Sequence, residues 1–173
     1  VHNESSAPGE FYYPNDVFID SKGNVFVADT LNDRVQKLDS NGNYIISWGL
    51  QTDGEGIFDT PTGVIIDGDG NLLVGDGKNR RILKYTIYGT YLSYYDIPGT
   101  SETSFFFDFD NDQNLFVSDY VSCALHKINS NGEIEKSVFG AYDELFYPTG
   151  ILVHPIDGLI YVVDSVHERI VVY

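Results

Sequence analysis

The sequence has no methionine, one cysteine and few basic side chains. Its 173 residues carry 10 Lys and Arg against 26 Asp and Glu, a formal net charge of −16. A field of that sign repels phosphate backbones and anionic membrane surfaces, so we expect no nucleic-acid partner. No apolar run approaches the roughly 20 residues that a membrane-spanning helix needs, so we expect no membrane insertion.

The other absences bear on stability and processing. Cys123 has no second cysteine to pair with, so we expect packing to hold the fold and Cys123 to be a buried thiol. Because there is no methionine, Val1 is not an initiator residue, and we expect a processed or excised piece. The triplet Asn3-Glu4-Ser5 fits the N-glycosylation pattern, which makes Asn3 a candidate glycosylation site and favours an extracellular or cell-surface location.

One pattern is written four times. VADTLNDRVQKLDSNG (27–42) returns as VGDGKNRRILKYTIYG (74–89) and VSDYVSCALHKINSNG (117–132), and in shortened form as VVDSVHERIVVY (162–173). A period in the forties is typical of propeller blades or helical-hairpin repeats. Short alternating apolar runs between Gly, Asn and Asp turns indicate strands rather than helices. The sequence therefore predicts an all-β fold, a β-propeller of four-stranded antiparallel blades.

These repeats resemble the NHL-repeat propellers. That family's repeat has an aromatic residue, Pro-x-Gly, a strand ending in Asp, a Gly-Asn turn, and a strand ending in Val-x-Asp before Arg-Ile or Arg-Val. The second copy carries nearly all of it, from Phe58 and Pro61 to Asp76 and Arg81. The third copy departs most, with three residues where the pattern has Pro, Gly and Arg: Ser104, Phe106 and Ala124. The resemblance implies a propeller scaffold and says little about activity.

The repeats divide the chain into an N-terminal extension and four blades. The predicted segments are an extension at 1–10 and blades at 11–57, 58–104, 105–145 and 146–173. The last blade lacks its outer strand, so we expect a part of a larger propeller, or assembly with other copies or another chain. The unpaired end of the chain is the predicted partner-binding edge: Arg169, Ile170, Val171, Val172 and Tyr173.

An Asp stands five residues before an Arg in three copies. The pairs are Asp29 with Arg34, Asp76 with Arg81, and Asp164 with Arg169. We interpret them as residues that hold the turn between two strands, because a catalytic site is normally written once. Asp119 of the third copy has no such Arg. Either that blade has drifted or its loop is adapted for a partner, and the candidate binding loop is Tyr120, Val121, Ser122 and Cys123.

Two stretches and four histidines raise the question of a metal. Alternating acidic residues resemble calcium loops, and the candidate ligands are Asp67, Asp69, Asp108, Asp110 and Asp112. The same positions fall in the first hairpin turn of a blade, where Asp and Asn are the usual turn formers, so calcium is the alternative to having no cofactor.

Lyases similar to this repeat family place histidines from different blades around a central channel. The four histidines are His2, His126, His154 and His167, of which His126 and His167 fall beside a third strand. We therefore expect surface or turn histidines rather than a shared metal site.

We predict a non-catalytic recognition or assembly module that binds protein or glycan partners, other copies of itself included. One alternative is a metal-dependent propeller lyase or hydrolase. Another is a structural subunit of an extracellular fibre or surface layer.

Overall fold

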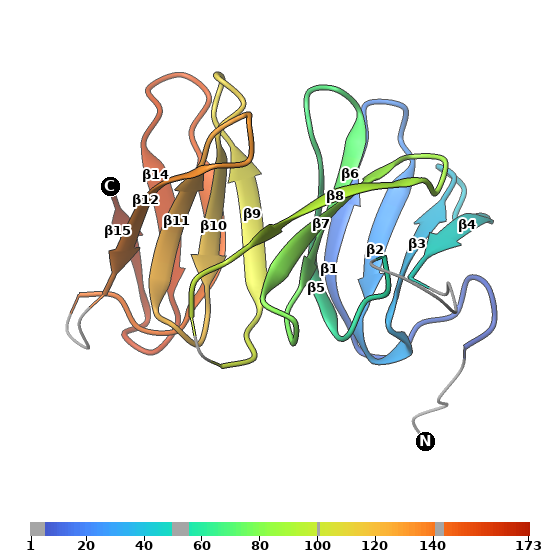
Figure 1. Cartoon of the computed structure of the whole chain (residues 1–173), viewed down its shortest axis with the longest axis horizontal. Helices are drawn as coiled ribbons and strands as arrows, with labels where there is room; N and C mark the ends of the chain where they lie inside the picture. Colours follow the sequence, from blue (N-terminus) through green and yellow to red (C-terminus); the bar gives the residue numbers. More distant parts are fainter. Residues whose placement is uncertain (1–5, 50–55, 100, 141–143) are drawn as a thin grey trace. The chain divides into compact units, whose positions relative to one another are not determined.

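The computed structural model describes residues 6–49, 56–99, 101–140 and 144–173. Asn3 and His2 lie outside these residues, so the glycosylation prediction stays a prediction. The described chain forms four antiparallel sheets, which Figure 1 shows in sequence order from blue to red. The predicted fold class, an all-β propeller built of antiparallel blades, is confirmed. No helix among the described residues has the length and apolar character to cross a membrane.

The chain divides into two compact units, residues 1–96 and 97–173. Unit 1 holds two four-stranded sheets, here blade 1 and blade 2, whose strands pair in sequence order. Blade 1 consists of β1 (Pro14–Ile19), β2 (Val25–Asp29), β3 (Arg34–Leu38) and β4 (Tyr44–Trp48), with a short 3-10 helix η1 (Thr30–Asn32). Blade 2 consists of β5 (Pro61–Ile66), β6 (Asn71–Asp76), β7 (Arg81–Thr86) and β8 (Tyr91–Asp96).

Unit 2 holds blade 3 and blade 4. Blade 3 consists of β9 (Phe105–Phe109), β10 (Leu115–Asp119), β11 (Ala124–Ile128) and β12 (Ile134–Phe139). Blade 4 consists of β13 (Pro148–Val153), β14 (Ile160–Asp164) and β15 (Arg169–Val172), so within the described ranges it has three strands where the others have four.

The core of each unit lies where its two blades face each other. In unit 1, Phe26 and Trp48 of blade 1 pack with Leu72 and Tyr85 of blade 2, all buried. Alternate residues along each strand point to one face, so the period of two in the sequence builds this layer directly. In unit 2 the core is smaller and gathers around Leu125, with Leu145 and Val162.

An inner-strand carboxylate ties the two blades of each unit together. Asp16, which stands where the repeat usually has Gly, accepts a hydrogen bond from the Val64 backbone N–H at 2.9 Å. Asp108 does the same in unit 2 with the Val153 backbone N–H at 2.7 Å. Burial raises the pKa of Asp16, against the lowering effect of its hydrogen bonds from Val64 and Val17.

Candidate functional site

The three Asp–Arg pairs fasten the loop that enters each blade. The Arg Nε lies 2.7 Å from Asp29 Oδ2 in blade 1, 2.8 Å from Asp76 Oδ2 in blade 2 and 3.0 Å from Asp164 Oδ2 in blade 4. Each Asp also accepts a backbone N–H from the entering loop: Tyr12, Asp59 and Phe146, respectively. Each Arg donates to carbonyl oxygens of the same loop, which agrees with a turn-holding role.

The pair in blade 4 has a further partner. His167 Nδ1 lies 2.9 Å from Asp164 Oδ2, and Arg169 Nε donates to the same carboxylate. Burial on its own would raise the pKa of Asp164, but hydrogen bonds from His167, Arg169 and the Phe146 backbone outweigh it and hold that pKa below its usual range.

In blade 3 the buried side chain next to Asp119 is a histidine, whereas the other blades have an Arg next to the equivalent Asp. His126 is fully buried, and its Nε2 lies 3.8 Å from Asp119 Oδ2. Its Nδ1 lies 2.8 Å from the Ser137 hydroxyl oxygen. Gln36 holds the equivalent position in blade 1, two residues after the Arg, and its side-chain amide also reaches Asp29, at 3.1 Å.

The expectation of a surface or turn histidine is therefore wrong for His126. The residue belongs to the face of β11 that also carries Ala124, and Asp119 is paired directly with Ala124 across the sheet. The equivalent residues Gln36 of blade 1 and Leu83 of blade 2 are also fully buried, so this strand position is a buried one in all three blades. A sequence signal did exist: the Arg is missing and a His stands two residues later, on the same face of the strand.

The candidate binding loop of the third repeat packs within unit 2. Cys123 is buried, as expected, and its sulfur accepts the Tyr147 backbone N–H at 3.5 Å. The ring of Tyr120 stacks on that of Tyr147 with centroids 4.7 Å apart. The Ser122 backbone N–H donates to Asp119, while the Val121 side chain is exposed. This loop therefore holds blade 4 against blade 3.

The candidate calcium ligands act in hairpin turns. Asp67 accepts the backbone N–H groups of Asp69 and Asn71, and its carboxylate lies 2.7 Å from Lys84 Nζ. Asp110 likewise accepts backbone N–H groups of its own turn, from Asp112 and Asn114.

Asp108 points elsewhere, to Val153 of the next blade. Within the described ranges no group of three or more His, Cys, Asp or Glu side chains is arranged to hold a metal ion. The calcium hypothesis stays a prediction.

The remaining histidine of unit 2 is held locally. His154 follows β13, and its Nδ1 lies 2.8 Å from Asp157 Oδ1 in an exposed turn. Leu159 donates its backbone N–H to the same carboxylate oxygen, so the histidine and Asp157 form a closed turn.

The predicted partner-binding edge is the outer edge of β15. Tyr173 and Ile160 exchange both backbone hydrogen bonds, at 3.0 and 3.1 Å, so they form a hydrogen-bonded pair between β14 and the end of β15. In an antiparallel pair the bonded residues alternate, so the backbone groups of Ile170 and Val172 point away from β14. No strand in the described chain pairs with that outer edge.

The first three blades show what normally occupies such an edge. The residue that follows the Arg position pairs with the fourth strand: Val35 with Trp48, Ile82 with Tyr95 and Leu125 with Val138. Ile170 is the equivalent residue of blade 4, directly after Arg169. Its side chain is 56% exposed, and that of Val172 is 49% exposed.

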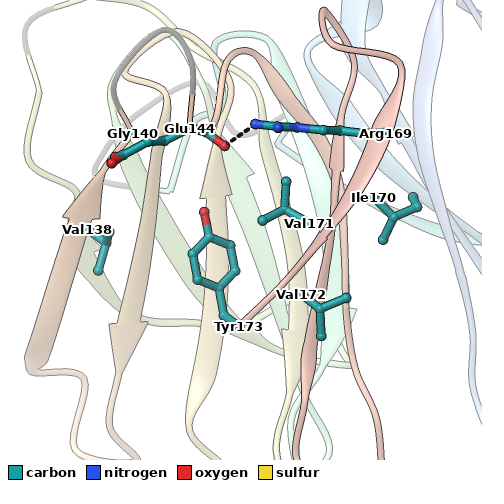
Figure 2. Close-up of a pocket in the computed structure, with 8 residues that line it drawn as sticks. All are labelled: Val138, Gly140, Glu144, Arg169, Ile170, Val171, Val172 and Tyr173. Carbon is teal, nitrogen blue, oxygen red and sulfur yellow. Dashed lines mark hydrogen bonds between the residues drawn. The ribbon is translucent and has the colours of Figure 1, made fainter.

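A groove of about 580 Å³ runs beside β15, between it and the end of β12 (Figure 2). Its lining is about half polar and half apolar. The apolar part includes Val138 and Val171 beside the Tyr173 ring, and at one end Arg169 donates a hydrogen bond to the Glu144 carbonyl. Partial burial raises the pKa of Tyr173, and the charges of Glu144 and Asp164 raise it further.

A second, smaller cavity of about 230 Å³ opens next to the groove. It is lined by Phe116, Leu125, His126, Lys127, Lys136, Val138, Ile160 and Tyr173. Val138 and Tyr173 border both spaces, so the cavity extends the groove into the layer between blades 3 and 4. Apolar walls next to unpaired backbone groups are the combination that an added strand requires.

No protein-family model matches the sequence, and no curated protein matches it, so the NHL-repeat assignment stays a prediction. Solved structures do match. They include a streptogramin B lyase (TM-score 0.69, 20% identity, 91% of this chain and 53% of that one). Virginiamycin B lyase from Staphylococcus aureus is similar too (TM-score 0.69, 17% identity, 91% and 54%). A third match is the WD40 beta propeller domain of Doa1 (TM-score 0.71, 12% identity, 92% and 50%).

The chain spans about half the length of these structures. At such identities the likeness shows the fold alone, and the neighbours range from lyases to a WD40 domain. The chain is thus a β-propeller chain.

Proposed function

We propose that this chain is a recognition or assembly module that binds a protein partner by accepting an extended segment on the outer edge of β15. One observation carries the proposal. In the described residues, the backbone groups on the outer edge of β15 are unpaired beside a groove of about 580 Å³, at the place where blades 1 to 3 carry a fourth strand.

The composition of this edge supports binding. Proteins usually protect an unpaired edge strand with lysines, prolines or bulges, because it can pair with any passing strand. The side chains that flank the free backbone groups here are Ile170 and Val172, both apolar and both exposed. An added strand gains backbone hydrogen bonds from the edge and apolar contacts from the groove.

The same features favour one class of partner over the others. Backbone hydrogen bonds along a strand select a polypeptide, so a protein fits better than a glycan. A second copy of the chain would bring another net charge of −16, which opposes self-association at low salt. A subunit of an extracellular fibre or surface layer would use this same edge and would differ only in its partner.

The lyase or hydrolase alternative has less support. It would need side chains that converge on a substrate or metal, but His154 and His167 are each paired with an Asp of their own turn, and His126 is buried beside Asp119. The lyases among the structural neighbours suggest this alternative only by fold. The extracellular location and the membership of the NHL-repeat family are part of the proposal and rest on the sequence.

Selection from a displayed library of random peptides tests the function. Peptides selected on the purified chain should bind the Val172→Thr variant but lose binding to Val172→Pro. Proline removes the outward N–H of residue 172 and leaves the hydrogen bonds between β14 and β15 in place, whereas threonine keeps the N–H and the strand preference. Selected peptides that bind Val172→Pro as tightly as the parent chain would contradict the proposal, as would a selection that yields no binder.

A further inference from the structure

We infer that the segment accepted by β15 carries an aromatic side chain opposite Tyr173, and that this side chain fills the cavity of about 230 Å³ between blades 3 and 4. The inference rests on the proposed function, because it specifies the chemistry of the partner at the same edge.

Blade 2 supplies the template for this position. Tyr85 lies four residues after Arg81, as Tyr173 lies four residues after Arg169. Tyr85 pairs with Tyr91 of the fourth strand, and the two rings meet edge to face with centroids 5.7 Å apart. Both rings belong to the core of unit 1, where Tyr85 is almost fully buried.

Unit 2 lacks the groups that fill this space in unit 1. Among the described residues no strand pairs with the outer edge of β15 to supply a residue like Tyr91, and Tyr173 is 44% exposed. Blade 3 also has no tryptophan at the position equivalent to Trp48, because the residue opposite Leu125 is Val138. In unit 1 the Trp48 ring packs on Phe26 with centroids 5.9 Å apart.

The position and the lining of the cavity therefore suit an aromatic side chain. A space of about 230 Å³ is several times the roughly 30 Å³ that a water molecule occupies in the liquid. Its walls include Phe116, Ile160 and the ring of Tyr173. An apolar space of this kind is better filled by a ring than by water.

Two lysines at the cavity refine the choice. Lys127 and Lys136 face each other across β11 and β12, and Lys127 is paired with Glu135 at 2.9 Å. The ammonium groups attract the face of an aromatic ring and repel a basic side chain. In blade 1 the equivalent Lys37 lies over the Phe26 ring, 5.2 Å from its centroid. The site should thus accept an aromatic residue and reject Lys or Arg.

The chain's own fourth strand provides a probe with the matched register. Residues 89–97, GTYLSYYDI, place Tyr91 opposite Tyr85 and Tyr94 opposite Leu83 in blade 2. Added to β15 in the same register, this peptide would set the ring of Tyr91 against Tyr173 and that of Tyr94 against Val171.

Fluorescence anisotropy with this peptide, labelled and flanked by lysines for solubility, tests the inference. The Tyr91→Ala peptide should bind the chain at least about tenfold more weakly than the parent peptide, because a buried ring is lost. The Tyr91→Lys peptide should bind more weakly still. Equal binding of the parent and the Tyr91→Ala peptides would overturn the inference.

A protein variant copied from blade 1 provides the matched control. Val138→Trp places a ring at the Trp48 position and fills part of the cavity from the protein side. Because Trp48 and Tyr91 share the core of unit 1, the parent peptide should still bind this variant more tightly than the Tyr91→Ala peptide does. Equal binding of the two peptides to the variant would contradict the inference. Should the variant fail to fold, nuclear Overhauser contacts between the peptide's first tyrosine ring and the Ile160 methyl groups decide instead, and their absence in a bound complex contradicts it.

The two proposals fail in different ways. If the parent and Tyr91→Ala peptides bind equally and both lose binding to Val172→Pro, only the aromatic inference fails. If no peptide binds, or if binding ignores Val172→Pro, the strand-addition proposal fails and the inference falls with it.

Discussion

His126 Nε2 lies 3.8 Å from Asp119 Oδ2 inside blade 3, where both side chains are fully buried. The other three blades place an Arg against the equivalent Asp. The third blade thus keeps the buried carboxylate and places a histidine rather than an arginine near it. Thr103 completes the site with a hydroxyl hydrogen bond of 2.5 Å to Asp119 Oδ1.

We expect His126→Ala to lower the free energy of unfolding by about 2–4 kcal/mol, because it opens a cavity and removes the hydrogen bond to Ser137. Ser137→Ala should cost about 1 kcal/mol. Urea unfolding measures both. The double variant Ala124→Arg with His126→Leu copies Arg81 and Leu83 of blade 2, and it should be more stable than His126→Leu alone. A His126→Ala variant as stable as the parent would show that the histidine does not support Asp119.

Two arginines of the same repeat position should differ in their contribution. Arg34 is 3% exposed and binds Asp29 together with the carbonyl groups of Ser6, Ala7 and Glu10. Arg34→Met should therefore cost about 3–5 kcal/mol, because it leaves a buried carboxylate without its charge partner. Arg169 is 44% exposed, so Arg169→Met should cost about 1 kcal/mol or less. Equal losses in urea unfolding would contradict this ranking.

The pKa of Asp164 should depend on His167. His167→Ala removes a hydrogen bond to the carboxylate, so the pKa of Asp164 should rise toward its ordinary value, as a carbon-detected NMR titration would show. A carboxylate whose pKa is lower in the folded than in the unfolded chain stabilises the fold at pH values above the unfolded-state pKa, near 3.9. The contribution of Asp164 to the free energy of unfolding should therefore be lost as the pH falls from about 4 through the pKa of the folded state.

The control for this titration is His154→Ala, which removes the partner of Asp157 in a separate turn. It should leave the pKa of Asp164 unchanged and raise that of Asp157, now lowered by hydrogen bonds from Leu159 and His154. A shift of Asp164 in the control variant, or none in His167→Ala, would refute the assignment.

Asp108 and Asp112 should separate a structural role from calcium binding. Asp108→Ala removes the acceptor of the Val153 N–H between blades 3 and 4 and should cost about 1–3 kcal/mol. Asp112 is exposed and contributes its backbone N–H to the turn, so Asp112→Ala should change the unfolding free energy by about 0.5 kcal/mol or less. Thermal unfolding with added calcium is the check, and a calcium-dependent stabilisation lost in Asp112→Ala would support the calcium hypothesis over the purely structural role.

The sequence predicted the features that repeat. Runs such as VFVAD and LLVGD became β2 and β6, strands whose residues are buried on both faces, because short apolar runs between turn residues favour a buried strand. The Asp–Arg pairs were recognised because three copies carry them. Features that depend on a neighbouring blade were not predictable in this way.

Three residues illustrate the limit. Asp16 and Asp108 hold similar links to the next blade at different repeat positions, so no alignment of the copies brings them together. His126 was misjudged because the residue type suggested a surface or turn position, whereas this strand position is fully buried in blades 1 to 3, as Gln36 and Leu83 show. The cavity beside Tyr173 likewise depends on residues from two blades, since in the part of the chain that the structure describes neither a fourth strand of blade 4 nor a tryptophan fills it.

The central claim is that the outer edge of β15 accepts a strand, and amide hydrogen exchange at this strand tests it most directly. Without peptide, the N–H groups of Ile170 and Val172 should exchange fast and that of Val171, bonded to β14, slowly. At saturating peptide GTYLSYYDI, Ile170 and Val172 should become at least about tenfold slower while Val171 changes little. Unchanged exchange at Ile170 and Val172 in the presence of bound peptide would contradict the account.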